Sequence, residues 1–180
     1  MILFSLLFAC SAHLEVFDTA ADQTQQEKFC ATLRGEQICD FDAIDVNGDA
    51  MALSDLYGKP IVLDLSASWC GPCIQAAAGL QAKANQLPDV TFLTVLIEDI
   101  GGMAPDEEDI SDWAEDNNIV TAPIWGSSRD VITSDPLELK DHLYLTGWPT
   151  FYFIDSEGKL QEYMRGYNAE AIIETAAALE

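Results

Sequence analysis

The chain of 180 residues carries 31 acidic and 8 basic side chains, for a formal net charge of -23 at pH 7. Binding to nucleic acid or to an anionic membrane surface needs basic patches, so this balance argues against both kinds of partner. It predicts instead a strongly solvated, salt-tolerant surface. Hydrophobic residues make up 49% of the chain, enough for one domain with a single core behind an N-terminal extension.

The first nine residues form an apolar run that is too short to cross a bilayer as a helix and is typical of a secretory signal. Residues 7–10 resemble the cleavage box of bacterial lipoproteins, with Cys10 as the lipidated residue. Against this, no Lys or Arg precedes the run, and Phe8 is bulky for its place. A plain cleaved signal, an uncleaved terminus and a true start further upstream are alternatives. We expect a leader over residues 1–10 and a lipid anchor at Cys10 that tethers the domain to a membrane face.

Residues 11–40 are predicted to be a tether, because their first half is polar and acidic with few apolar residues. Cys30 and Cys39 enclose the turn signal Arg34-Gly35 and could close a short loop through a structural disulfide. Two unpaired thiols are the alternative. A stable disulfide there would imply an oxidising compartment.

Residues 41–46 alternate in polarity and are predicted to form an edge strand. The dipeptide Asn47-Gly48 that follows is the strongest two-residue signal for a hairpin. Ser54 is predicted to cap a short helical turn that ends at Tyr57.

The next stretch is an apolar run from Ile61 with one acid in it, Asp64, and it is predicted to be a buried strand. It leads into Cys70-Gly71-Pro72-Cys73. Pro72 suits the first turn of a helix, so Cys70 is expected to lie exposed at a helix N-terminus with Cys73 one turn further in. The helix dipole and free N–H groups there favour a thiolate, and two residues between the cysteines allow a reversible disulfide.

The rest of the chain alternates between helical and strand patterns. We predict helices over 71–87, 106–118, 135–143 and 169–179, and strands over 90–97, 119–125, 150–154 and 160–165, with 127–133 ambiguous. This order is typical of an α/β fold with a central mixed sheet covered on both faces.

The pentapeptide Trp69-Cys70-Gly71-Pro72-Cys73 resembles the active-site motif of the thioredoxin superfamily. The segments 47–60 and 147–158, the latter containing Gly-Trp-Pro-Thr, resemble the TlpA/ResA-like extracytoplasmic branch. The resemblance covers about residues 41–180. It implies that this domain is a thioredoxin-like three-layer sandwich, with a central mixed β-sheet and helices on both faces.

The resemblance also implies a thiol–disulfide oxidoreductase whose catalytic residues are Cys70, the nucleophile, and Cys73, the resolving thiol. Gly71 and Pro72 would border the bound substrate chain. The implied partners are envelope proteins with cysteine disulfides or dithiols and an upstream dithiol protein that donates electrons. We expect a monomeric reductant at the periplasmic face of a bacterial membrane, with no cofactor besides the Cys70–Cys73 disulfide.

Asp64 matches the position of an aspartate that relays a proton to the resolving cysteine in thioredoxins, so the resemblance implies that it is the acid/base for Cys73. Its place in an apolar strand should raise its pKa, because burial penalises the charged form. The alternative is an acid that only makes a hydrogen bond near the surface.

Pro149 matches a proline that, in the family that this chain resembles, is cis and faces the disulfide. The backbone of Trp148 would then pair with a substrate strand, and Thr150 would complete this second part of the substrate-binding site. Trp69 would form an apolar lip for the partner, or else belong to the core.

Three other readings follow from the same residues. A peroxiredoxin would need Pro and Thr upstream of its cysteine, where this chain has Ser66, Ala67 and Ser68. A copper chaperone or a non-catalytic thioredoxin-like binding module is the alternative from another class. Neither His13 nor His142 has cysteine or acidic neighbours at ligand spacing, so no metal site is predicted.

The second cysteine pair can be tested directly. Mass spectrometry of the unreduced, digested protein should find Cys30 linked to Cys39, because a nine-residue separation around a turn allows the bond. Free thiols at both positions would contradict the pairing and weaken the assignment to an oxidising compartment.

Overall fold

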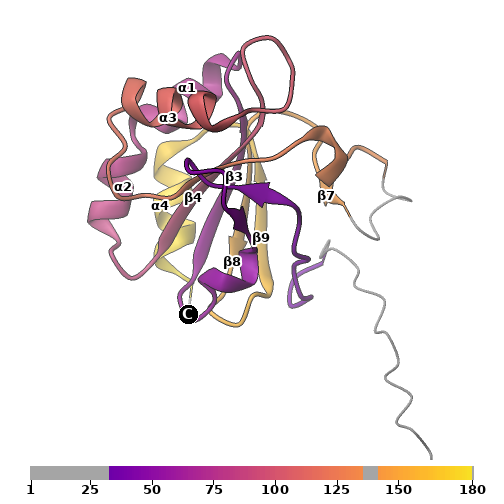
Figure 1. Ribbon diagram of the computed structural model, residues 1–180. Coiled ribbons are helices and arrows are strands. Elements are labelled where there is room, and N and C mark those ends of the chain that lie inside the picture. The colour runs from indigo at the N-terminus through magenta and orange to yellow at the C-terminus, as the bar shows by residue number, and fades with distance from the viewer. Residues whose placement is uncertain (1–32, 136–141, 180) are drawn as a thin grey trace, which may run out of the picture.

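The computed structural model describes residues 33–135 and 142–179 (Figure 1). The predicted leader over 1–10, the lipidation site Cys10, most of the tether and Cys30 lie outside these residues. Most of the helix predicted over 135–143 also lies outside them, and its last residue, Leu143, belongs to a short strand instead.

A seven-stranded mixed sheet in the order β2-β1-β5-β4-β3-β8-β9 forms the centre of the domain. Its central strand β3 pairs in parallel with β4 and antiparallel with β8, and β4 pairs in parallel with β5. The strands are β1 (Ala43–Ile44), β2 (Ala50–Met51), β3 (Ile61–Ala67), β4 (Thr91–Glu98), β5 (Ile124–Gly126), β8 (Thr150–Ile154) and β9 (Leu160–Arg165); β6 (Ile132–Thr133) pairs separately with β7 (Leu143–Tyr144). The predicted mixed sheet is therefore confirmed.

The helices follow the predicted order, with one break. The helix expected over 71–87 is divided at Gly79 into α1 and α2. A Cβ at Gly79 would lie 2.8 Å from Nζ of Lys83, so the glycine leaves room for that ammonium group. The helices are α1 (Gly71–Ala78), α2 (Leu80–Gln86), α3 (Glu107–Asp116) and α4 (Ala169–Ala177), with 3-10 turns η1 (Leu53–Leu56) and η2 (Arg129–Val131).

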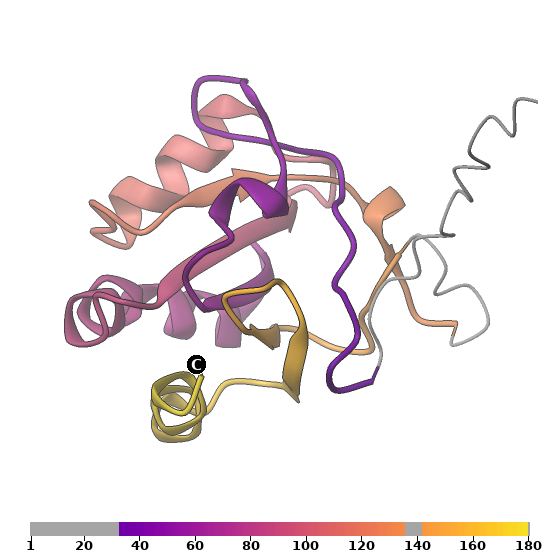
Figure 2. The ribbon, with the colours of Figure 1, turned by 90° about the horizontal axis from the view of Figure 1, so that it is seen from below.

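Two apolar cores lie on opposite faces of the sheet, because alternate side chains of a strand point to opposite sides. The four α-helices pack on one face, through residues that include Ala76, Leu80, Trp113 and Ile172. The 3-10 turns and residues 38–41 cover the other face. The view from below shows the indigo N-terminal segment on the side away from α2 and α3 (Figure 2). Helical turns thus cover both faces, but within residues 33–135 and 142–179 the α-helices lie on one face.

The hairpin predicted at Asn47-Gly48 is confirmed, since β1 pairs antiparallel with β2 across it. The first strand is shorter than the predicted 41–46. Asp45 leaves the strand because its carboxylate accepts hydrogen bonds from the backbone N–H groups of Asn47 and Asp49, at 2.8 and 3.0 Å. The side chain therefore builds the turn instead of extending the strand.

The cap predicted at Ser54 is wrong. The N-cap of η1 is Ala52, and Ser54 lies inside the turn. Its backbone N–H and its hydroxyl both donate to the carboxylate of Asp40, each at 2.9 Å. Ser54 thus bonds to a distant acid, and the local capping contact comes from Asp55, whose carboxylate accepts the N–H of Ala52 at 3.3 Å.

Within residues 33–135 and 142–179, no helix is both long and apolar enough to cross a lipid bilayer.

Gly158 is expected to be a sensitive position in the last hairpin. It has φ +85°, and a Cβ there would lie 2.3 Å from the Tyr57 ring. Gly158→Ala should lower the free energy of unfolding by roughly 2–4 kcal/mol, through left-handed strain and overpacking together. Chemical denaturation measures this loss.

Gly58→Ala is the matched control, because Gly58 has φ +101° but no atom within 4 Å of its added Cβ. It should lose only about 1–2 kcal/mol from the backbone strain. Equal losses in the two variants would contradict the packing argument.

Candidate active site

The two cysteines lie where the central strand meets the first α-helix. After β3 ends at Ala67, the N–H of Cys70 donates to the carbonyl of Ala67 at 3.0 Å and closes a turn. Cys70 is then the N-cap of α1, and its Sγ accepts the N–H of Cys73 at 3.2 Å. The two sulfurs form a disulfide, with their Cα atoms 5.2 Å apart. The predicted placement at a helix N-terminus, with proline in the first turn, is confirmed.

The predicted exposure of Cys70 is wrong for this oxidised state. Cys70 is 4% exposed and Cys73 is fully buried. The sulfur of Cys70 is bonded to Cys73 and accepts its N–H, which holds the side chain against the helix. The residues around it are open: Trp69 is 44% exposed, and Gly71 and Pro72 are both exposed. A partner would therefore approach across this rim.

Asp64 lies on the sheet face that α1 and α2 cover, three residues before the end of β3. It is 2% exposed, and the hydroxyl of Ser66 donates to its carboxylate at 2.9 Å. Burial raises the pKa of Asp64 to about 7, against the opposing effects of the Ser66 hydrogen bond and the Lys83 charge. The predicted direction of the shift is confirmed, and the carboxyl can take up or release a proton near neutral pH.

Lys83 is a polar partner of this region that the sequence analysis missed. It is 8% exposed, and its ammonium donates to the carbonyl of Ala76 at 3.3 Å. It also lies 3.4 Å from the Tyr167 hydroxyl and 5.2 Å from the centre of that ring. Burial lowers the pKa of Lys83, while Asp64 raises it. The spacing could have predicted the burial of Lys83, because positions 76, 80, 83 and 87 share one helix face and only position 83 is charged.

Glu98 was also not predicted as a site residue, and it anchors Trp69, the predicted apolar lip. Glu98 ends β4, is 4% exposed and accepts the indole N–H of Trp69 at 2.6 Å. Its other carboxylate oxygen forms a salt bridge with Arg129. In addition, the N–H of Ser68 donates to the Glu98 carbonyl at 2.9 Å. The lip is therefore anchored to the adjacent parallel strand, and the acid that directly follows the apolar run ending at Ile97 was the signal for it.

The distal loop meets the lip through its tryptophan. The Trp148–Pro149 peptide bond is cis, as the resemblance implied. The rings of Trp148 and Trp69 lie 6.0 Å apart at 78°, an edge-to-face contact. Thr150 is fully buried, and its hydroxyl donates to the Gly147 carbonyl at 2.7 Å. Thr150 thus closes the loop from inside and does not reach the surface.

The remaining predicted sites can be placed only in part. Cys39 is 4% exposed, whereas Cys30 lies outside the described residues, so their pairing stays a prediction. Among residues 33–135 and 142–179, no group of three or more His, Cys, Asp or Glu is arranged to hold a metal ion.

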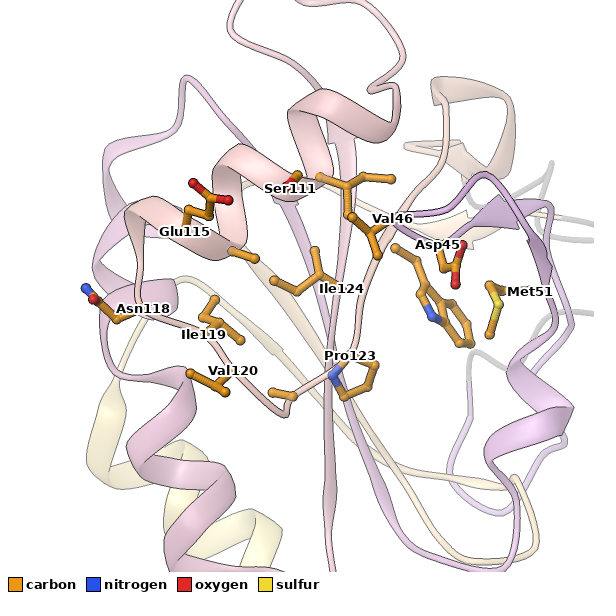
Figure 3. Close-up of a pocket in the computed structure, with 14 residues that line it drawn as sticks. Asp45, Val46, Met51, Ser111, Glu115, Asn118, Ile119, Val120, Pro123 and Ile124 are labelled. Carbon is orange, nitrogen blue, oxygen red and sulfur yellow. The ribbon is translucent and has the colours of Figure 1, made fainter.

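An apolar hollow of about 600 Å³ lies between α3, β5 and the β1–β2 hairpin (Figure 3). Asp45 and Glu115 are the titratable side chains in its lining, and neither cysteine of the pair reaches it. The carboxylate of Asp45 is already used in its turn. This hollow is separate from the redox site.

The buried carboxyl gives a prediction for stability against pH. Because the pKa of Asp64 is about 7 instead of 3.8, the folded chain binds this proton more tightly than the unfolded chain between those values. The contribution of Asp64 to stability is therefore complete below about pH 4 and declines as pH rises to about 7. In the oxidised protein, Asp64→Asn should raise the free energy of unfolding at pH 8 by a few kcal/mol, and far less at pH 4.

Chemical denaturation at both pH values measures this difference. Asp112→Asn is the control, because Asp112 is exposed and its neutralisation should give no comparable pH-dependent gain. A gain from Asp64→Asn that is equal at pH 4 and pH 8 would contradict the shifted pKa.

Comparisons with known proteins agree with this geometry. The thioredoxin-like protein YneN of Bacillus subtilis is 24% identical over 140 residues, which cover 78% of this chain and 76% of that protein. A DsbF homologue from Corynebacterium diphtheriae superposes with a TM-score of 0.63 at 18% identity, covering 84% of this chain and 91% of that one. The exposed lipoprotein thioredoxin Etrx1 of Streptococcus pneumoniae superposes with a TM-score of 0.57 at 26% identity, covering 78% and 100%.

The predicted thioredoxin-like fold is therefore confirmed. The model of the AhpC/TSA family matches residues 34–163, well over half of the chain and the whole redox site. The chain belongs to the AhpC/TSA family, within its thioredoxin-like members.

Proposed function

We propose that the protein is a thioredoxin-like thiol–disulfide oxidoreductase that exchanges disulfides with other proteins through Cys70 and Cys73. One observation carries the proposal: the two cysteines form a disulfide across the first turn of α1, beneath an open rim. A helix N-terminus stabilises the thiolate that such exchange requires. Family membership and the names of the relatives support the same chemistry.

In the reduced protein, the Cys70 thiolate attacks one sulfur of a partner disulfide. A Cys70–partner bond forms, and the other partner sulfur leaves as a thiolate. Cys73 then loses its proton and attacks Cys70 Sγ, so the partner leaves with both sulfurs reduced and the Cys70–Cys73 bond is formed. Two electrons pass from the protein to the partner, and a separate dithiol protein must return them.

Asp64 is proposed to accept the proton that Cys73 releases. Its carboxyl has a pKa of about 7 and lies on the covered face beneath α1, so it can exchange a proton at neutral pH. The buried ammonium of Lys83 favours the charged carboxylate and limits the rise of that pKa.

We further propose that the protein acts as a reductant of envelope proteins outside the cytoplasm. The Gly71-Pro72 pair, the leader-like run over 1–10 and the likeness to an exposed lipoprotein thioredoxin support this assignment. A peroxidase role is not supported, because the hydroxyl of Ser66 is fully buried and is already bonded to Asp64. No specific observation favours the copper chaperone or the non-catalytic module.

Substitution of each cysteine tests the exchange. Cys70→Ser should abolish insulin reduction, because it removes the nucleophile. Cys73→Ser should leave the first step intact and accumulate mixed disulfides with partner proteins, since nothing displaces them. Non-reducing gels of native extracts read this out.

The double variant Cys70→Ser/Cys73→Ser is the control and should trap nothing. The absence of any trapped species with Cys73→Ser, together with full insulin reduction by Cys70→Ser, would contradict the proposed exchange. Equilibration of the wild-type pair with glutathione then separates a reductant from an oxidant, because the potential decides the direction of electron flow.

A further inference from the structure

A groove of about 350 Å³ runs beside the redox pair, between the active-site loop and α3. Ser68 and Ile74 flank the cysteines in sequence and form one side of it. Helix α3 and the loop after β4 form the other. The groove is lined by Ser68, Ile74, Ile100, Asp109, Asp112, Trp113, Asp116 and Asn117, and we call it the α3 groove.

Exposed apolar side chains gather at this end of the sheet. Ile74 is 45% exposed and Ile100 is 76% exposed, and both line the α3 groove. Trp69 and Met103, at 44% and 69%, lie in the same two loops. These loops follow the carboxyl ends of the parallel strands β3 and β4 and therefore share one edge. Exposed apolar residues that gather around a reactive cysteine indicate a surface for a partner.

The opposite wall of the α3 groove is acidic. Asp109, Asp112 and Asp116 share one face of α3, because they are three and four residues apart. Asp109 is used in the helix cap through Asp106. Within the described residues, the carboxylates of Asp112 and Asp116 accept no hydrogen bond and form no salt bridge. Repulsion between these two carboxylates lowers the stability of α3, and so does a negative charge in its last turn, where the helix dipole is negative. A cation bound here would reduce both destabilising effects.

Trp113 adds a polar group that lacks a partner. It is 6% exposed, lines the α3 groove, and its indole N–H finds no acceptor within the described residues. A buried N–H without an acceptor is costly. The N–H itself lies below the surface of the α3 groove, so a bound segment would contact the Trp113 ring and not this N–H.

We propose that the α3 groove binds a basic segment of the oxidised partner protein, with an apolar residue between two Lys or Arg side chains near the target cysteine. The apolar residue packs against Ile74 and Ile100, and the cations pair with Asp112 and Asp116. Cys70 then meets the partner disulfide across the exposed rim. This inference rests on the proposed oxidoreductase function and names the class of substrate that it takes.

Two synthetic peptides with the same intramolecular disulfide test the proposal, one followed by Lys-Leu-Lys and the other by Glu-Leu-Glu. Reactions of each peptide with the reduced full chain are quenched at successive times, and the amount of reduced peptide gives the second-order rate constant. The basic peptide should react faster. The double variant Asp112→Asn/Asp116→Asn should react with it roughly three- to tenfold more slowly than wild type, as expected for two exposed ion pairs. Ile100→Ser should also slow it.

The net charge of -23 would attract a basic peptide to any part of the surface, so a matched control is needed. Glu108→Gln/Glu115→Gln removes the same charge from the same helix, at exposed positions outside the α3 groove. It should keep nearly the wild-type rate. An equal loss in both double variants, or no preference between the peptides, would overturn the proposal.

Reduction of neutral 2-hydroxyethyl disulfide separates the two proposals. Both double variants of α3 and Ile100→Ser should reduce this disulfide at the wild-type rate, because the molecule is too small to need the α3 groove. Failure of the wild type with this probe would count against the oxidoreductase function itself. Normal reduction together with no preference for the basic peptide would count against the groove alone.

Discussion

The disulfide across the first turn of α1 depends on how β3 ends. Strand β3 is buried along its whole length, and β8 pairs with it as far as Leu65 while β4 pairs with it to its end at Ala67. The turn from Ala67 to Cys70 therefore begins from a fixed point, and the Cys73 N–H in the first turn of α1 donates to the sulfur of Cys70. The end of the strand, the N-terminus of α1 and the two sulfurs therefore meet at one junction, beside the exposed rim formed by Trp69, Gly71 and Pro72.

Beneath that junction the sheet contains a polar layer that a purely structural core would not need. Asp64 and Ser66 are bonded to each other, Thr94 pairs with Asp64 across the strands, and Lys83 approaches from α2. The Thr94 hydroxyl has no hydrogen-bond partner within the described residues. Burial of such groups opposes folding, and within this layer it raises the pKa of Asp64 to about 7.

The charge of the molecule acts on two scales. The overall excess of acid keeps the chain solvated and gives it a general attraction for cations. The local arrangement is more selective, because Glu98 is paired with Trp69 and Arg129, whereas Asp112 and Asp116 are left open beside exposed apolar residues. Paired acids fix the geometry of the rim, and unpaired acids remain available for a partner.

By itself, the sequence determined the mixed sheet, the order of its main elements, the Asn47-Gly48 hairpin and the cysteine pair at a helix start. These features depend on periodicity, turn chemistry and spacing, which act between neighbours along the chain. The tertiary structure alone decided the burial of Cys70, the break at Gly79, and the contacts of Lys83 and Glu98. It also decided that Ser54 bonds to Asp40 and that α1 to α4, the α-helices of the described residues, share one face. The contacts of Glu98 with Trp69 and Arg129, and of Lys83 with Tyr167, join residues tens of positions apart, which local sequence pattern does not encode. The burial of Cys70 and the break at Gly79 involve near neighbours, but packing within the folded core sets where those side chains lie.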